Sequence, residues 1–190
     1  WITNTQVNFC AKAYPTVPIN HPDVAALTVL GGFLRSGFLH RAIREQGGAY
    51  GGGASQNSNN AAFCFYSYRD PRLQQTLDDF DAAIEWILTN DHQQMQLEQA
   101  ILGVIGGLDK PSSPAGEAKQ EFYNTLFGRS HEQRRVFRQR ILQVNLTDLQ
   151  RVTTTYLRRE LSSTAVITNR ATHQQLSDFV SENGMQVFSL

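Results

Sequence analysis

The stretch AYGGGASQNSNNAAFCFYSY, residues 49–68, decides the fold class of this chain. Residues 49–55 and 61–68 are predicted strands, and the polar residues 56–60 between them are typical of a turn. The second strand carries aromatic residues on both faces, so we expect it to lie in the centre of a sheet. The stretch therefore predicts a hairpin inside a larger sheet.

The segments that precede this hairpin also carry regular patterns. Residues 6–14 form a predicted strand whose two faces differ in polarity. The apolar face carries Val7, Phe9, Ala11 and Ala13, and the mostly polar face carries Asn8, Cys10 and Lys12. Apolar residues at helical spacing then predict one helix over residues 24–45, which ends at Gly47 and Gly48.

Downstream of the hairpin the sequence predicts mainly helices. An apolar stripe covers residues 73–87, and two capping boxes, Ser130 with Gln133 and Thr147 with Gln150, mark helix starts. Further helices are predicted at 92–107, 115–127 and 171–183, and further strands at 164–168 and 185–190. This order predicts an α+β fold, in which a mostly antiparallel sheet is covered by helices on one face.

The domain organisation follows from length and from the start of the chain. A length of 190 residues suits one well-buried core. The chain begins at Trp1, shows no signal-peptide pattern, and leads at once into a strand. We expect residues 1–190 to form a single domain, the last one of a longer multidomain protein. A processed small protein is the alternative.

Composition argues against several classes of partner. Lys plus Arg equals Asp plus Glu, at 17 each, so no basic surface for nucleic acid or an anionic membrane is indicated. The apolar stretches are shorter than a membrane helix requires. The aromatic strand could resemble an RNA-stacking platform, but core packing explains it better because basic surroundings are missing. We expect no nucleic-acid and no membrane partner, and we expect Cys10 and Cys64 to be small apolar residues, not ligands or nucleophiles.

The glycine-rich run at residues 47–53 is the least ordinary feature of the sequence. It is not a phosphate-binding loop, because it lacks the Gly-Lys-Ser/Thr ending and follows a predicted helix instead of opening one. A flexible hairpin is one interpretation. The other is a strand edge made of Gly51, Gly52 and Gly53, stripped of side chains so that an extended peptide can add to it.

Two polar side chains flank this run. Arg44 lies at the end of the predicted helix, where a cation also interacts favourably with the helix dipole. Tyr50 is a large polar aromatic residue among small ones, so it has little to pack against locally. A guanidinium can donate to peptide carbonyls, and a phenol can donate to a developing oxyanion. His40 lies one turn before Arg44 and either lines the same surface or is a solvated or packed residue without a role there.

No metal site or hydrolase triad is predicted in this chain. None of the five histidines has a partner at zinc-ligand spacing. Neither Ser55 nor Ser67 has a neighbouring His and Asp arrangement in the sequence. We therefore predict no bound metal and no peptidase activity for these 190 residues alone.

The segment IREQGGAYG, residues 43–51, together with SYRDP, residues 67–71, resembles the C-terminal half of pitrilysin/insulinase peptidases. The resemblance is nearest to the presequence protease branch and is dense over residues 6–77. It implies a protein of two halves that enclose unfolded peptides in a chamber. It also implies that the N-terminal half binds zinc through an HxxEH motif and a distal Glu.

The same resemblance implies roles for residues of this chain. Arg44 and Tyr50 would reach across the chamber to the substrate beside the zinc, and Gly51, Gly52 and Gly53 would accept the peptide as an added strand. This chain would hold no cofactor itself, with zinc present in the full-length enzyme. Its partners would be the N-terminal catalytic half of the same polypeptide and a peptide substrate.

Two functions of different class follow. In the first, the chain is part of a zinc metalloendopeptidase that degrades short or unfolded peptides. In the second, it is a catalytically inactive peptide-binding or scaffolding module of the same fold. An HxxEH motif elsewhere in the polypeptide separates the two. The compartment would be the cytoplasm in a bacterium and an organellar matrix in a eukaryote.

Overall fold

Four antiparallel strands form one sheet in the order β2-β3-β1-β4. The computed structural model describes residues 1–189. The strands are β1 (Asn8–Pro15), β2 (Gly51–Asn57), β3 (Ala62–Asp70) and β4 (Ser163–Ile167). At the hairpin between β2 and β3, Asn57 Oδ1 accepts from the amides of Asn59 and Asn60 at 3.1 and 3.2 Å, which closes the turn. The predicted hairpin is confirmed, and β3 lies inside the sheet as expected.

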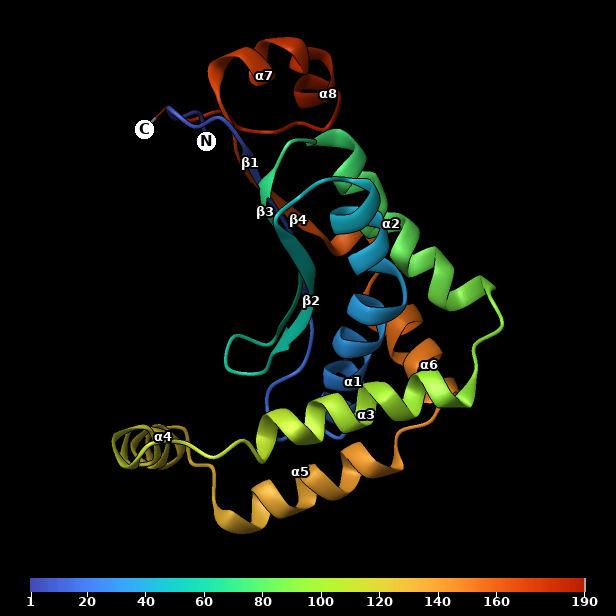
Figure 1. Cartoon of the computed structure of the whole chain (residues 1–190), viewed down its shortest axis with the longest axis vertical. Helices are drawn as coiled ribbons and strands as arrows, with labels where there is room; N and C mark the ends of the chain where they lie inside the picture. The colour runs from blue at the N-terminus through green and yellow to red at the C-terminus, as the bar shows by residue number, and fades with distance from the viewer. Residues whose placement is uncertain (190) are drawn as a thin grey trace.

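Helices cover one face of this sheet. Figure 1 shows α1, α2, α3, α5 and α6 gathered on one side of the strands, while α4 projects away from the body. The helices are α1 (Val24–Leu34), η1 (Arg35–Gln46), α2 (Gln74–Thr89), α3 (Gln94–Leu108), α4 (Pro114–Leu126), α5 (His131–Gln143), α6 (Leu146–Tyr156), η2 (Arg159–Leu161), α7 (Arg170–Gln175) and α8 (Ser177–Glu182). This arrangement is the predicted α+β fold.

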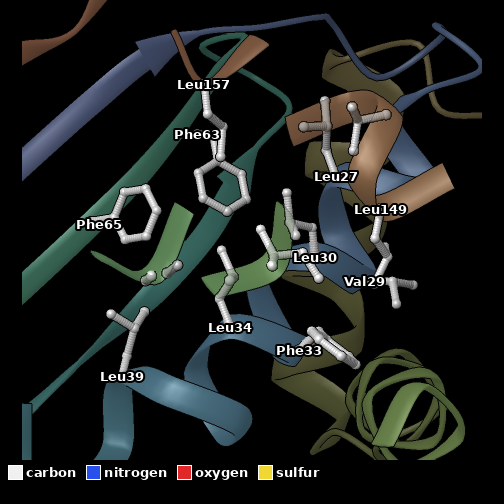
Figure 2. Close-up of a cluster of buried hydrophobic side chains, with 14 of the residues drawn as sticks. Leu27, Val29, Leu30, Phe33, Leu34, Leu39, Phe63, Phe65, Leu149 and Leu157 are labelled. Atoms are coloured by element: carbon white, nitrogen blue, oxygen red, sulfur yellow. The ribbon is translucent and has the colours of Figure 1, made fainter. Parts of the chain in front are cut away.

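The core lies between the sheet and α1. Figure 2 shows Phe63 and Phe65 of β3 facing Leu30 and Leu34 of α1, and all four side chains are fully buried. Phe65 also lies against Phe80 of α2, with ring centroids 5.5 Å apart. Helix α1 approaches β2 so closely that a Cβ at Gly31 would lie 3.0 Å from the Ala54 carbonyl oxygen, where only glycine fits without a shift. The glycine thus permits the contact that fixes α1 against the edge strand.

The helix predicted over residues 24–45 changes its winding halfway. Its first part is the α-helix α1, and its second part, η1, is a π-helix. Hydrogen bonds from i to i+5 widen each turn of a π-helix. Apolar spacing does not distinguish the two windings over so few turns, so the change could not be predicted from the sequence pattern.

Strand β1 turns its polar face inward. Asn8 and Lys12 are 3% and 6% exposed on the helix-covered face, whereas Phe9 is 36% exposed on the other. Asn8 donates to the carbonyl oxygens of Asp70 and Arg72 and accepts from Thr168 Oγ1. Lys12 pairs with Asp81. The alternation predicted two faces correctly, but it does not reveal that partners from distant segments allow the polar one to be buried.

Three local predictions near the end of the chain were wrong or incomplete. The capping box of α6 is Asn145 with Asp148, two residues before the predicted Thr147 with Gln150, whereas Ser130 with Gln133 caps α5 as predicted. The predicted helix 171–183 is divided into α7 and α8 at Leu176. The predicted strand 185–190 forms only an isolated bridge from Ser189 to Ile2, and residue 190 lies outside the described residues.

Candidate functional site

The residues singled out in the sequence meet at one groove beside the edge strand β2. This groove of about 460 Å³, called here the Arg44–Tyr50 groove, lies between η1 and the open face of the hairpin. Its lining consists of Arg35, Ser36, His40 and Arg44 from η1, Tyr50, Gly51 and Gly52 at the start of β2, and Tyr66 and Tyr68 from β3.

The π-helical winding of η1 determines which of its side chains share this groove. Arg35, His40 and Arg44 are spaced by five and four residues, close to one wide turn each. In an α-helix Arg35 and Arg44 would be about two and a half turns apart, on opposite sides. Arg35 and Arg44 therefore line one groove because the helix is under-wound there.

Tyr50 stands at the mouth of the groove and is 65% exposed. Its amide donates to the Arg69 carbonyl oxygen at 3.2 Å, and the preceding Ala49 amide donates to the Ile43 carbonyl oxygen at 3.1 Å. Its ring lies beside Tyr68, with centroids 5.6 Å apart, and below the Arg69 guanidinium at 5.7 Å. The backbone is thus fixed while the phenol remains free to contact another molecule.

Arg44 is exposed and its backbone holds the turn that leads to Tyr50. Its carbonyl oxygen accepts from the Gly48 amide at 3.1 Å, and Gly48 has a φ of +77°, which glycine adopts without strain. Within residues 1–189, neither Arg44 nor Arg35 forms an ion pair. His40 Nδ1 lies 3.2 Å from Glu45 Oε1. Arg35 and Arg44 thus line the groove without an ion pair inside the described part of the chain, while the Glu45 carboxylate contacts His40.

The three glycines of β2 have their faces covered by the protein itself. A Cβ at Gly51 would lie 2.6 Å from the Tyr68 ring, and one at Gly52 would lie 2.8 Å from Ile43 Cγ2. A Cβ at Gly53 would lie 3.1 Å from the aliphatic part of Arg35. Glycine is thus needed at these three positions for packing inside the domain.

A buried polar network holds the groove in place. The Asp70 carboxylate is fully buried and accepts from the Arg72 amide at 2.9 Å and from Thr76 Oγ1 at 2.8 Å. Arg72 donates to the Ala42 carbonyl oxygen at 3.2 Å and to Asp79 at 2.8 Å, and it passes directly over Gly47. These contacts tie the end of η1 to β3 and α2. Only Asp70 of this network lies in the SYRDP motif, residues 67–71, which carried the family resemblance but did not predict a buried carboxylate.

The described residues offer no grouping suited to a metal or to a reactive thiol. Among residues 1–189, no three His, Cys, Asp or Glu side chains come together in a way that could hold a metal ion. Burial raises the pKa of the Cys10 thiol to about 12 and also raises the pKa of Cys64.

Within residues 1–189, none of the helices has the length and apolar character that spanning a membrane requires.

Comparison with known protein families identifies the fold and the motifs together. A family model described as the PreP C-terminal domain matches residues 1–168. The chain belongs to this family. The resemblance to the presequence protease branch, based on IREQGGAYG and SYRDP, is confirmed.

The curated relatives of this PreP C-terminal domain are much longer proteins. Presequence protease, mitochondrial, from Yarrowia lipolytica is 42% identical over 152 residues, which are 80% of this chain and 15% of the relative. The protein of the same name from Kluyveromyces lactis is 38% identical over 163 residues, 85% of this chain and 16% of the relative. The protein of that name from Drosophila melanogaster is 39% identical over 162 residues, which are 84% of this chain and 15% of the relative. The chain thus spans about a sixth of these relatives.

Solved structures share the fold at low sequence identity. A protease from Helicobacter pylori superposes with a TM-score of 0.73 at 15% identity, covering 88% of this chain and 43% of that one. A peptidase M16 inactive domain from Pseudomonas fluorescens superposes with a TM-score of 0.70 at 15% identity, covering 88% of this chain and 42% of that one. Pitrilysin superposes with a TM-score of 0.62 at 15% identity, covering 88% of this chain and 19% of that one. The PreP C-terminal domain therefore has the fold of pitrilysin-type peptidase domains.

Proposed function

We propose that this PreP C-terminal domain supplies substrate-binding and oxyanion-stabilising groups to a longer zinc metalloendopeptidase that degrades short or unfolded peptides. One observation carries the proposal: Arg44 and Tyr50 both line one groove, and both side chains are exposed there. A phenol and an unpaired guanidinium beside an edge strand suit an extended peptide backbone, which offers carbonyl oxygens as acceptors.

The proposed roles follow from the chemistry of peptide hydrolysis. As water adds to the scissile carbonyl, negative charge develops on its oxygen, and the Tyr50 hydroxyl would donate a hydrogen bond to that oxygen. Arg44 would donate to a neighbouring carbonyl and hold the peptide in position. Removing one oxyanion donor typically lowers the rate by about 10²–10³. Within residues 1–189, no three His, Cys, Asp or Glu side chains come together as zinc ligands. The metal of the full-length enzyme would therefore belong to another part of the polypeptide.

The edge of β2 is the proposed track for the peptide backbone. β2 is the outermost strand on its side of the sheet, and Gly52 within it is partly exposed. Because the faces of Gly51 and Gly53 are covered by Tyr68 and by Arg35, the peptide would contact main-chain groups at the edge. Side-chain contacts would then come from the groove on either side.

The proposed partners and compartment follow from the relatives. Since this chain covers 14–16% of the presequence proteases it matches and its family model is described as a C-terminal domain, we propose that it is the last domain of a polypeptide whose N-terminal half holds the catalytic metal. Relatives are named mitochondrial, which supports an organellar matrix if the source is a eukaryote. A bacterial source would place the protein in the cytoplasm.

Substitution of Tyr50 by Phe in the full-length protein tests this function. It removes only the hydroxyl from a side chain that is 65% exposed, so we expect an unchanged melting temperature and a kcat that falls by about 10²–10³. Tyr123→Phe is the matched control, because Tyr123 is a 41% exposed tyrosine on the projecting α4, and it should keep full activity. Unchanged turnover in Tyr50→Phe would remove Tyr50 from the mechanism.

An inactive peptide-binding module is the second candidate function. It is favoured by a structural neighbour described as a peptidase M16 inactive domain, which shows that this fold also occurs without activity. In that case the full-length protein would bind unfolded peptides without cleaving them, and zinc analysis would find no stoichiometric metal. Cleavage that depends on added zinc and is lost with a chelator would exclude this candidate.

A further inference from the structure

The open face of the sheet carries a second, apolar surface beside the Arg44–Tyr50 groove. It encloses about 530 Å³ and is called here the apolar sheet surface. None of its lining side chains is charged: the residues are Trp1, Phe9, Cys10, Ala11, Tyr66, Ser67, Tyr68, Ala165, Val166 and Ile167. Phe9, Tyr68 and Ile167 remain 36%, 40% and 38% exposed. Contiguous exposed apolar groups of this kind mark interaction sites.

The chain exposes this apolar surface while burying polar residues on the same strand. On β1, Asn8 and Lys12 lie under the helices, and Phe9 and Ala11 point to the open side. The opposite orientation of β1 would have placed Phe9 and Ala11 in the core, where apolar groups are normally found. The buried polar atoms are held by specific partners, the Asp70 carbonyl oxygen for Asn8 and Asp81 for Lys12. The exposed apolar face is therefore built into the strand pairing.

The apolar sheet surface is continuous with the groove through the register of the strands. One row across the sheet runs from Gly53 through Tyr66 and Ala11 to Ala165, and each pair is directly opposite. A parallel row pairs Gly51 with Tyr68 on one side and Phe9 with Ile167 on the other. Tyr66 and Tyr68 line both the groove and the apolar sheet surface. A molecule seated at Tyr50 thus lies beside an uncharged face.

We propose that the apolar sheet surface binds bulky apolar side chains of the same peptide that occupies the Arg44–Tyr50 groove. This inference rests on the proposed function and adds a substrate preference to it. β3 separates β2 from β1, so Phe9 lies two strand spacings, about 10 Å, from Gly51. A peptide that leaves the edge of β2 beside Tyr50 and crosses the open face of the sheet advances about 3.3 Å per residue when extended. The preferred apolar residue therefore lies about three residues from the bond that is cleaved.

Two peptides and two variants of the full-length protein test this preference. The peptides are identical except for Leu or Ser three residues from the cleaved bond. We expect wild type to favour the Leu peptide in kcat/KM, and Phe9→Ser or Ile167→Ser to lower that value by about fivefold to tenfold. Activity on the Ser peptide should stay unchanged. Leu102→Ser is the matched control, since Leu102 of α3 is 68% exposed outside both surfaces, and it should not alter the preference.

Direct binding separates this inference from the proposed function. Fluorescence anisotropy with both labelled peptides measures affinity without cleavage. If wild type cleaves neither peptide but binds the Leu peptide in a Phe9-dependent way, the peptidase function fails and the apolar site stands. If cleavage depends on Tyr50 but neither Phe9→Ser nor Ile167→Ser changes the preference, the inference is overturned. It is overturned equally if Phe9→Ser leaves kcat/KM unchanged and lowers the melting temperature or dissociates a dimer, because the face is then covered by protein.

Discussion

Replacing Gly52 by alanine tests why the edge strand is so rich in glycine. A Cβ at this position would lie 2.8 Å from Ile43 Cγ2 and 3.0 Å from the Tyr66 carbonyl oxygen. Ile43 is fully buried and the carbonyl belongs to the neighbouring strand, so neither can move freely. Inserting one methyl group into such a contact costs about 1–3 kcal/mol. The lower entropy of the unfolded alanine chain offsets about 0.4–1 kcal/mol.

The net destabilisation is then on the order of 1–2 kcal/mol. For a chain of this length, each kcal/mol lowers the melting temperature by about 2–4 °C. Thermal unfolding followed by circular dichroism should therefore show a melting temperature about 2–8 °C below wild type. Gly103→Ala is the matched control, because no atom outside its own helix lies within 4 Å of a Cβ there. As an exposed helical position it should gain stability, by about 0.5–1 kcal/mol.

The result also distinguishes the two interpretations of the glycine run. If glycine is required only so that a peptide can approach, Gly52→Ala would melt like wild type and lose peptide affinity. If it is required for packing against Ile43, the melting temperature falls whether or not peptide is present. An unchanged melting temperature, measured with Gly103→Ala behaving as expected, would refute the packing argument.

Two further predictions concern titratable groups. The hydrogen bond from Arg151 at 2.7 Å, supported by that from Tyr156, lowers the pKa of Asp23, so ionised Asp23 stabilises the fold above its ordinary pKa of 3.8 and this contribution is lost as pH falls through the lowered value. Asp23→Asn should therefore lower the free energy of unfolding by about 1–2 kcal/mol at pH 7. Urea unfolding should show that this difference from wild type shrinks below about pH 4, and an equal difference at pH 3 would contradict the assignment. Because burial raises the pKa of Cys10 to about 12, a thiol reagent at pH 8 should label Cys64 first and Cys10 only after unfolding, as peptide mass spectrometry would show; early labelling of Cys10 would contradict its burial.

The sequence predicted those features that depend on local pattern. The polar residues 56–60 are turn formers, so the hairpin follows from their chemistry alone. The spacing of Leu27, Leu30 and Leu34 predicts a buried helical face, and all three are fully buried in the structure. The motif around Arg44 and Tyr50 placed the candidate site near the junction of this helix with the hairpin, which is where the groove lies.

Features that depend on distant partners could not be predicted in this way. Lys12 is buried because Asp81, 69 residues further along the chain, lies beside it, and no local pattern announces that pairing. The role of Arg72 depends likewise on the Ala42 carbonyl oxygen, 30 residues earlier. The π-helical turn at residues 35–46 preserves the buried positions of Leu39 and Ile43, so the apolar pattern looks like that of an α-helix.

These non-local features explain how one sheet can have a buried core face and an open apolar face, the one proposed above to bind peptide. If β1 had turned Phe9 inward, its open side would carry Asn8 and Lys12, and the strand beside Tyr66 and Tyr68 would be polar and charged. Burying Lys12 with Asp81 and Asn8 with Asp70 removes that polarity from the open side. The under-wound η1 then places Arg35 and Arg44 at one border of the resulting apolar face. An extended chain lying there would meet hydrogen-bond donors at one end and uncharged aromatic surface at the other, which is the combination that an unfolded peptide with mixed side chains can satisfy.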